Sequence, residues 1–164
     1  MSLSDRRSFV VALTSLTALA ACGFQPVYAP GSGAASLRNA VQVDAPSNRT
    51  TFDMVRAIED RLGRAENARY GLAIAQTEVV NSLAIEGSSA VTRFNIVATA
   101  NFTLTDRTTG TVASSGSVRT FTSFSATGST VATAAAQKDA RRRLAAGLAD
   151  LIVTQLLLDV PDPA

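Results

Sequence analysis

The chain has 164 residues, of which 46% are hydrophobic but only 5% aromatic, and its net charge is +2. This length fits one domain with one core of ordinary size. The chain has no histidine and a single cysteine, which excludes an internal disulfide, a Cys/His metal site and catalysis by a histidine base, and the small net charge argues against nucleic-acid binding.

The amino-terminal segment is typical of a bacterial export signal. Two arginines precede an apolar run over residues 9–21, which is too short to span a bilayer as a helix. A leucine and two alanines then lead directly to Cys22, the pattern of a lipoprotein signal. We therefore predict that residues 1–21 are removed and that Cys22 carries covalent lipid, with no other cofactor. The paired arginines leave the general secretory and twin-arginine export routes both open.

The residues around the anchor predict where the protein is held. Two or three acyl chains, at about 0.8 kcal/mol per buried CH₂, fix a protein firmly to a membrane. Gly23 follows the cysteine, where an aspartate is the familiar inner-membrane retention signal of enteric bacteria. We therefore expect the periplasmic side of the cell outer membrane. Residues 22–36 are rich in Gly, Pro, Ser and Ala and are predicted to form a flexible tether before a single domain over residues 37–160.

The domain is predicted to open with a strand and a helix. Residues 37–44 alternate weakly and are followed by a proline, as expected of a short strand. Thr50–Asp53 approximates a capping box for a helix over residues 51–62, with Gly63 at its end. The positions that follow helical spacing here are Phe52, Val55, Ile58, Glu59 and Leu62.

Three strands are predicted over residues 72–83, 93–104 and 111–125. The second is the clearest, because apolar residues alternate with Asn and Thr over its whole length, which indicates one buried and one wet face. Residues 106–110 form the expected hairpin turn. Gly116 interrupts the alternation of the last strand, where we expect a β-bulge.

A long helix is predicted over residues 129–158, and the prolines beyond it prevent continuation. Its expected apolar stripe comprises Val131, Ala135, Leu144, Leu148, Leu151, Ile152 and Leu156. The basic run Arg141–Arg143 lies off this stripe and is interpreted as a solvated helix face. The elements predict an α+β fold: a two-layer sandwich in which two helices cover one face of a mostly antiparallel four-stranded sheet, in the order β-α-β-β-β-α.

The start of the processed chain, Cys22-Gly-Phe-Gln-Pro-Val-Tyr28, resembles the Cys-Gly-Phe-x-Pro-Leu-Tyr start of the lipopolysaccharide-assembly lipoprotein family LptE, and the element order covers the rest. The resemblance implies a non-enzymatic protein that plugs the barrel of the outer-membrane protein LptD, helps to assemble it and assists delivery of lipopolysaccharide to the outer leaflet. The implied partners are thus an LptD-type barrel, lipopolysaccharide and the outer membrane.

The strands also suggest how such partners are met. A plug requires a polar surface because the lumen of a barrel is polar, and the Ser-, Thr- and Asn-rich strand faces supply one. Lipopolysaccharide carries phosphates, and guanidinium groups bind phosphate through two parallel hydrogen bonds. Arg93, Arg107 and Arg119, near strand ends, are therefore the candidate lipopolysaccharide-binding residues, although each is also compatible with a plain surface charge.

Two other functions stay open at this point. One is a periplasm-facing structural lipoprotein without a barrel partner. The other is a hydrolase that uses a serine or a carboxylate pair, which requires a Gly-x-Ser-x-Gly turn or paired acids in a cleft. The glycine–serine pairs at Gly128–Ser129 and Gly87–Ser89 lack that framing.

Overall fold

A computed structural model describes residues 32–83 and 92–160; the signal sequence, Cys22 and most of the expected tether lie outside them. The predicted order of elements is confirmed, with one additional short helix before it. In chain order the elements are α2 (Gly33–Leu37), β1 (Val41–Val43), α3 (Arg49–Leu62), β2 (Tyr70–Leu83), β3 (Arg93–Asp106), β4 (Val112–Ser125) and α4 (Thr130–Asp159).

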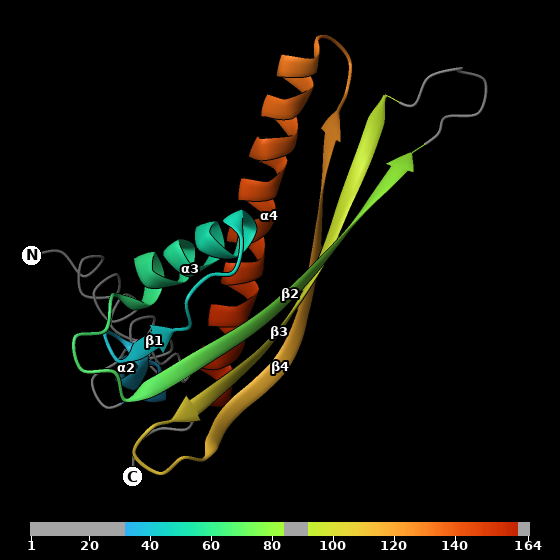
Figure 1. The fold of residues 1–164 in the computed structure, drawn as a ribbon. Coiled ribbons are helices and arrows are strands. Elements are labelled where there is room, and N and C mark those ends of the chain that lie inside the picture. Colours follow the sequence, from blue (N-terminus) through green and yellow to red (C-terminus); the bar gives the residue numbers. More distant parts are fainter. Residues whose placement is uncertain (1–31, 84–91, 161–164) are drawn as a thin grey trace, which may run out of the picture.

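The four strands form one sheet in the order β1-β2-β3-β4 (Figure 1). β2, β3 and β4 are long antiparallel neighbours, whereas β1 is short and pairs in parallel with the first three residues of β2. A parallel pair requires a crossover connection, which α3 provides. The sheet is therefore mixed, and the predicted mostly antiparallel α+β fold is confirmed.

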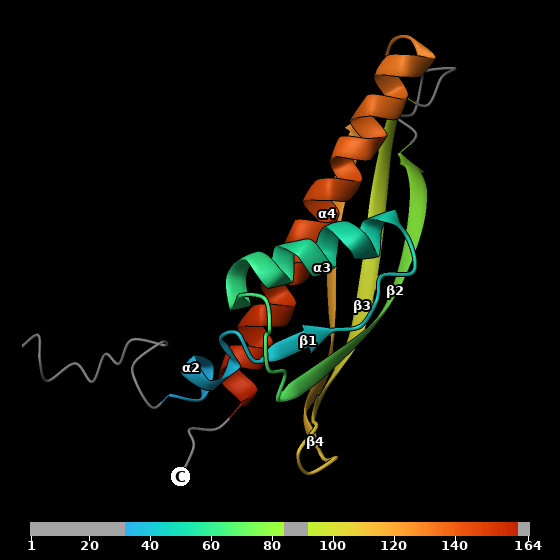
Figure 2. The same ribbon diagram turned by 60° about the vertical axis from the view of Figure 1, so that its left-hand side comes forward.

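Both long helices lie on the same side of the sheet, and the other side carries no helix among the described elements (Figure 2). α4 packs along β4 and β3 and also against α3. An ion pair between Asp150 of α4 and Arg61 of α3 joins the two helices. The core between the layers is aliphatic, and its largest fully buried side chains are Leu37, Met54, Ile58, Leu62, Leu72, Ile96, Leu104, Leu144, Leu148, Ile152 and Leu156.

β3 confirms the alternation predicted for residues 93–104. Ile96, Ala98, Ala100, Phe102 and Leu104 are buried beneath the helices, whereas the residues between them are half-buried or exposed on the other face. This single strand fixes the orientation of its neighbours, because residues paired across strands share a face. The sheet thus has a helix-covered face and a helix-free face, the latter formed by odd-numbered positions of β2 and β3.

The start of the domain differs from the expected extended chain. Gly33–Leu37 forms one helical turn capped by Ser32, and Leu37 is fully buried instead of beginning a strand. Asn39 then takes a positive φ of 55°, which asparagine tolerates, and its backbone N–H donates to the carbonyl of Leu62. The strand predicted over residues 37–44 is therefore wrong at its start, because this turn reorients the chain before β1.

The helix α3 begins earlier than predicted. The side chain of Asn48 accepts from the backbone N–H of Thr51, whose hydroxyl in turn accepts from the N–H of Asn48, so the capping box lies at these residues and not at Thr50–Asp53. Met54 is fully buried, whereas Phe52 is 49% exposed, because the face turned to the core passes through positions 51, 54, 58 and 62. Gly63 ends the helix with φ 80°, as expected.

The β-bulge predicted at Gly116 is wrong. The register shift lies closer to the hairpin, where Ser114 pairs with Leu104 but Val112, and not Ala113, pairs with Thr105. Gly116 is instead a site of close approach: a Cβ there would lie 2.6 Å from Nε2 of Gln155 on α4 and 2.9 Å from Cζ of Phe102. Its missing side chain allows the helix to pack against the sheet.

The stripe predicted on α4 is correct in its second half only. Leu144, Leu148, Ile152 and Leu156 are buried, but Leu151 is 41% exposed and Val131 is 77% exposed. Towards the amino-terminal end, the inward face continues through Ala140 and Ala136 instead of Ala135 and Val131. These small alanine side chains allow α4, which is 30 residues long, to stay close to the sheet in its first half.

Candidate functional site

The structure does not bring the three predicted arginines together. Arg93 begins β3, and Arg107 follows its last residue, so they lie at opposite ends of a 14-residue strand that spans about 45 Å. Arg119 lies between them on β4, directly opposite Thr99. A single phosphate group therefore cannot contact all three, and each must be considered in its own surroundings.

Arg107 has a structural role in the β3–β4 turn. Its Nη1 donates to Oε1 of Gln42 at 2.7 Å, and its backbone N–H donates to the carbonyl of Arg69 at 2.8 Å. Its guanidinium also lies over Gly71, where a Cβ would be 3.1 Å from Nε. These contacts join the turn to β1 and β2, so the side chain is already engaged at this end of the sheet.

Asp106, which sequence reasoning did not single out, organises the same turn. Its carboxylate accepts from the backbone N–H of Thr108 at 2.8 Å and from Nε of Arg69 at 3.1 Å, and the residue is only 7% exposed. The backbone hydrogen bond from Thr108, together with Arg69, holds the pKa of Asp106 below its ordinary value. The signal available in the sequence was an aspartate at the first position of the predicted turn, where its side chain can accept from the backbone N–H two residues further on.

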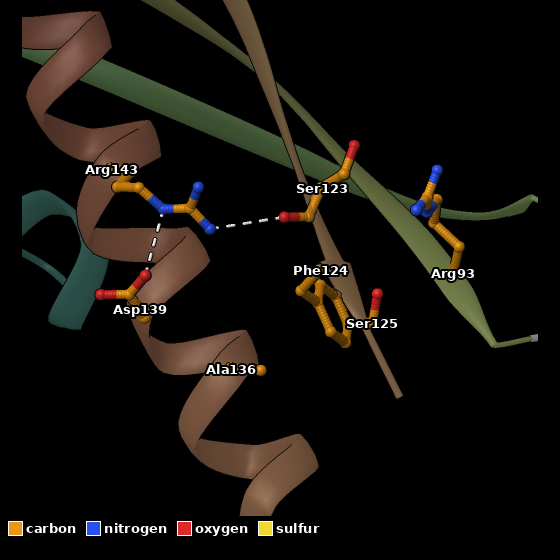
Figure 3. Close-up of a pocket in the computed structure, with 7 residues that line it drawn as sticks. All are labelled: Arg93, Ser123, Phe124, Ser125, Ala136, Asp139 and Arg143. Carbon is orange, nitrogen blue, oxygen red and sulfur yellow. Dashed lines mark hydrogen bonds and ion pairs between the residues drawn. The ribbon is translucent and has the colours of Figure 1, made fainter. Parts of the chain in front are cut away.

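Arg93 lies at the opposite end of the sheet, in a cavity of about 360 Å³. Figure 3 shows the two cations of this cavity on either side of β4: Arg143 reaches from α4 toward the backbone of Ser123, and Arg93 lies beyond the strand. Nη2 of Arg143 donates to the carbonyl of Ser123 at 3.4 Å, and its Nε contacts Asp139 at 3.1 Å. The remaining lining residues are Phe124, Ser125 and Ala136.

The charges of this cavity are only partly balanced. Asp139 is shared between Arg142 and Arg143, and the hydrogen bond from Arg142 is the main cause that lowers its pKa. Arg93 is exposed, and 60% of the Arg143 side chain is accessible. Guanidinium N–H groups and serine hydroxyls are donors that suit phosphate oxygens. Arg143 was expected to be only part of a solvated helix face, so sequence reasoning did not show that it lines the same cavity as Arg93.

Arg119 lies on the helix-free face, beside a second cavity of about 370 Å³. Its lining residues are Asn95, Val97, Arg119, Thr120 and Phe121. Phe121 is 68% exposed, which is unusual for an aromatic side chain without a polar group. This part of the protein therefore combines a cation, hydroxyl and amide groups, and one unburied aromatic ring.

The described residues carry neither a metal-ligand cluster nor a membrane-spanning helix. They contain no cluster of three or more Asp, Glu, Cys or His side chains that could hold a metal ion. Within the same ranges, no helix is both long and apolar enough to cross a membrane.

Comparison with solved structures defines the class of fold. A lipoprotein from Caulobacter crescentus is 21% identical, with a TM-score of 0.64 over 77% of this chain and 94% of that one. Rare lipoprotein B from Shewanella oneidensis is 12% identical (TM-score 0.54; 70% and 89% covered), and a minor lipoprotein from Acinetobacter baumannii is 18% identical (0.53; 76% and 94%). The fold is thus one found in bacterial lipoproteins.

The sequence identifies the family within that class. The profile of the family LptE, lipopolysaccharide-assembly, matches residues 38–156, which is more than two thirds of the chain. The chain therefore belongs to the LptE family. The matched residues lie in the folded domain and do not include Cys22–Tyr28, so they confirm the suspected family independently of that motif. No curated protein sequence is significantly similar to this chain.

Proposed function

We propose that this protein is an outer-membrane lipoprotein that plugs an LptD-type barrel, helps to assemble it and assists delivery of lipopolysaccharide to the outer leaflet. The observation that carries the proposal is the family match over residues 38–156. The chain is lipidated at Cys22, faces the periplasm and acts without enzymatic chemistry. The lipoprotein pattern that ends in Cys22 supports the anchor.

The cavity at the Arg93 end of the sheet is the favoured contact for lipopolysaccharide. Arg93 and Arg143 offer two guanidinium groups on either side of one strand, and Ser123 and Ser125 of that strand also line the cavity. A phosphate at this position would accept hydrogen bonds that are assisted by charge. Arg107, by contrast, is engaged within the turn and is not part of this contact.

The helix-free face supports the role as a plug. Its side chains are mainly Ser, Thr and Asn, which can pair with the polar groups that line a barrel lumen. The regular pairing of the sheet supports it as well, because β2 and β3 are in register over all 14 residues of each strand. A structured insert of this kind keeps its shape while a barrel closes around it.

Co-isolation tests the proposal against its main alternative. The full-length, lipidated protein with a carboxyl-terminal affinity tag is extracted from membranes in mild detergent, and bound proteins are identified by mass spectrometry. We expect one outer-membrane barrel in stoichiometric amount. Recovery of the lipoprotein alone, after in vivo cross-linking as well as without it, would instead support a structural lipoprotein that has no barrel partner.

A further inference from the structure

The helix-free face has an uneven distribution of charge. Its positions on β2, β3 and β4 include Arg93 and Arg119, and no acidic side chain occurs among those that the structure describes. The acidic residues of β2 and β3, Glu78 and Asp106, belong to the opposite, helix-covered set of positions, where each is paired with an arginine. This face is therefore suited to a surface that supplies negative charge.

One level of this face is apolar across all three long strands. Val79 pairs with Val97, and Val97 pairs with Phe121, so the three side chains form a continuous row. Val79 is 58% and Phe121 is 68% exposed, and both Val97 and Phe121 line the cavity of about 370 Å³. On a solvated sheet such cross-strand pairs contribute only about 0.2–1 kcal/mol each, whereas burial of a Val or Phe side chain contributes about 1.5–3 kcal/mol.

The levels on either side of the row are polar. Asn95 and Ser123 face each other on one side, with 3.4 Å between the Oγ of Ser123 and the Oδ1 of Asn95, and Thr99 faces Arg119 on the other. An acyl chain requires an apolar strip along its own length, which one row does not provide. A small apolar centre with a rim of hydrogen-bonding groups is the anatomy of a protein interface.

A second copy of this chain does not fit the row. Two such faces in contact would bring the arginines of both copies together without an acidic residue from either, and like charges across an interface cost affinity. The charge and the narrow row fit a protein surface with an acidic group opposite Arg119 and an apolar side chain opposite the cavity. Aromatic residues and arginines are the side chains that most often dominate binding energy at such contacts.

We infer that the row Val79–Val97–Phe121, together with Arg119, is the contact through which this lipoprotein holds the inner wall of its barrel partner. The inference rests on the proposed function, because it names the surface that the proposed partner occupies. Phe121 is the anchor of the contact, and Arg119 orients it by pairing with an acidic residue of the wall. The phosphate contact proposed at Arg93 and Arg143 lies on the other cavity.

The test uses the full-length tagged protein in its own membranes. Phe121→Ser introduces the residue type that β4 carries on this face at Ser117 and Ser123. We expect it to lower the amount of co-isolated barrel by roughly tenfold or more, the effect of losing one dominant contact. Arg119→Glu should have a similar effect. The matched controls are Val131→Ser, at an exposed apolar position on α4, and Lys138→Glu, at an exposed cation of the same helix; both should retain the barrel.

A photo-reactive amino acid at position 121 identifies the occupant directly. We expect a covalent adduct with the barrel. A homodimer adduct or a lipid adduct without the barrel would overturn the inference, as would a Phe121→Ser variant that retains the barrel as the wild type does. If wild-type protein recovers no barrel at all, the proposed function itself fails, so the two failures are distinguishable. Unchanged thermal unfolding of the variants shows that a loss does not come from misfolding.

Discussion

The carboxylate of Asp106 accepts a hydrogen bond from Nε of Arg69, 37 positions earlier in the chain, at 3.1 Å. This contact joins the β3–β4 turn to the residue that precedes β2. Arg69 also lies over the ring of Tyr70, 5.2 Å from its centroid. One end of the sheet is therefore held by a network of polar contacts, whereas the other end carries the cavity at Arg93.

The turn network predicts a dependence of stability on pH. Because the pKa of Asp106 is lowered in the folded protein, its contribution to stability is complete above the ordinary value of 3.8 and is lost as the pH falls below that value. Asp106→Asn should therefore unfold at a lower temperature at neutral pH and lose less on acidification. Thermal unfolding followed by circular dichroism between pH 7 and acid conditions measures both effects.

The control for this prediction is Asp60→Asn, which removes an exposed carboxylate on α3. It should keep the profile of the wild type. An Asp106→Asn profile that runs parallel to the wild type over the acid range would show that this carboxylate does not stabilise the turn.

Two glycines on either side of the interface between α4 and β4 make opposite predictions. Gly116→Ala places a Cβ 2.6 Å from Gln155 and 2.9 Å from Phe102, and we expect a loss of about 1–3 kcal/mol in the free energy of unfolding. Gly147→Ala on α4 meets Thr120 at an ordinary 3.6 Å, and alanine favours the helix by up to about 1 kcal/mol. Urea unfolding of both variants measures the two values.

The mechanism at Gly116 can be separated from a general intolerance of β4. Adding Gln155→Ala to Gly116→Ala should recover part of the loss, because one of the two close contacts is removed. Equal stability of the single and the double variant would contradict the close approach described here.

The anchor is tested at the single cysteine. Cys22→Ser should abolish labelling by a radioactive or clickable fatty acid and release the protein from the membrane fraction, because no other thiol can accept the diacylglycerol. Gly23→Ala keeps the cysteine and should remain labelled. Continued labelling of the serine variant would place the lipid elsewhere in the chain.

The phosphate contact is tested by two substitutions at one cavity. Arg93→Gln combined with Arg143→Gln should weaken binding of lipopolysaccharide by roughly tenfold or more, since hydrogen bonds to charged groups each contribute about 1.5–3 kcal/mol. Arg142→Gln removes a neighbouring exposed cation outside the cavity and serves as the control. Binding is measured with purified lipopolysaccharide, and with the same material after removal of its phosphates.

The expected difference is specific to phosphate. Wild-type protein should lose affinity when the phosphates are removed, and the double variant should not respond. A double variant that binds intact lipopolysaccharide as well as the wild type does would exclude this cavity as the contact.

The fold could be predicted because its elements follow local patterns. Each of three features is encoded in one continuous stretch of sequence: the alternation along β3, the turn at residues 106–110 and the long helix α4. The errors arose where a distant residue decides the outcome: Gln155 explains Gly116, and the turn at Asn39 displaces the start of β1. No sequence pattern reports such contacts.

The candidate sites were less predictable for the same reason. Arg93, Arg107 and Arg119 are chemically alike in the sequence, but one lies at an open cavity, one is fixed to Gln42 and one borders an apolar row. The row itself joins residues 79, 97 and 121, which only the strand register brings side by side. Arg93 and Arg143 likewise line one cavity only because α4 lies beside β4.

Controlled depletion of the protein tests the central claim most directly. Surface lipopolysaccharide and the mature, folded barrel are measured over time in the same cells, with a plasmid copy of the wild type as the complementation control. We predict that both fall together and that the plasmid copy restores both. Unchanged levels of both after the protein is gone would contradict the proposed role in lipopolysaccharide assembly.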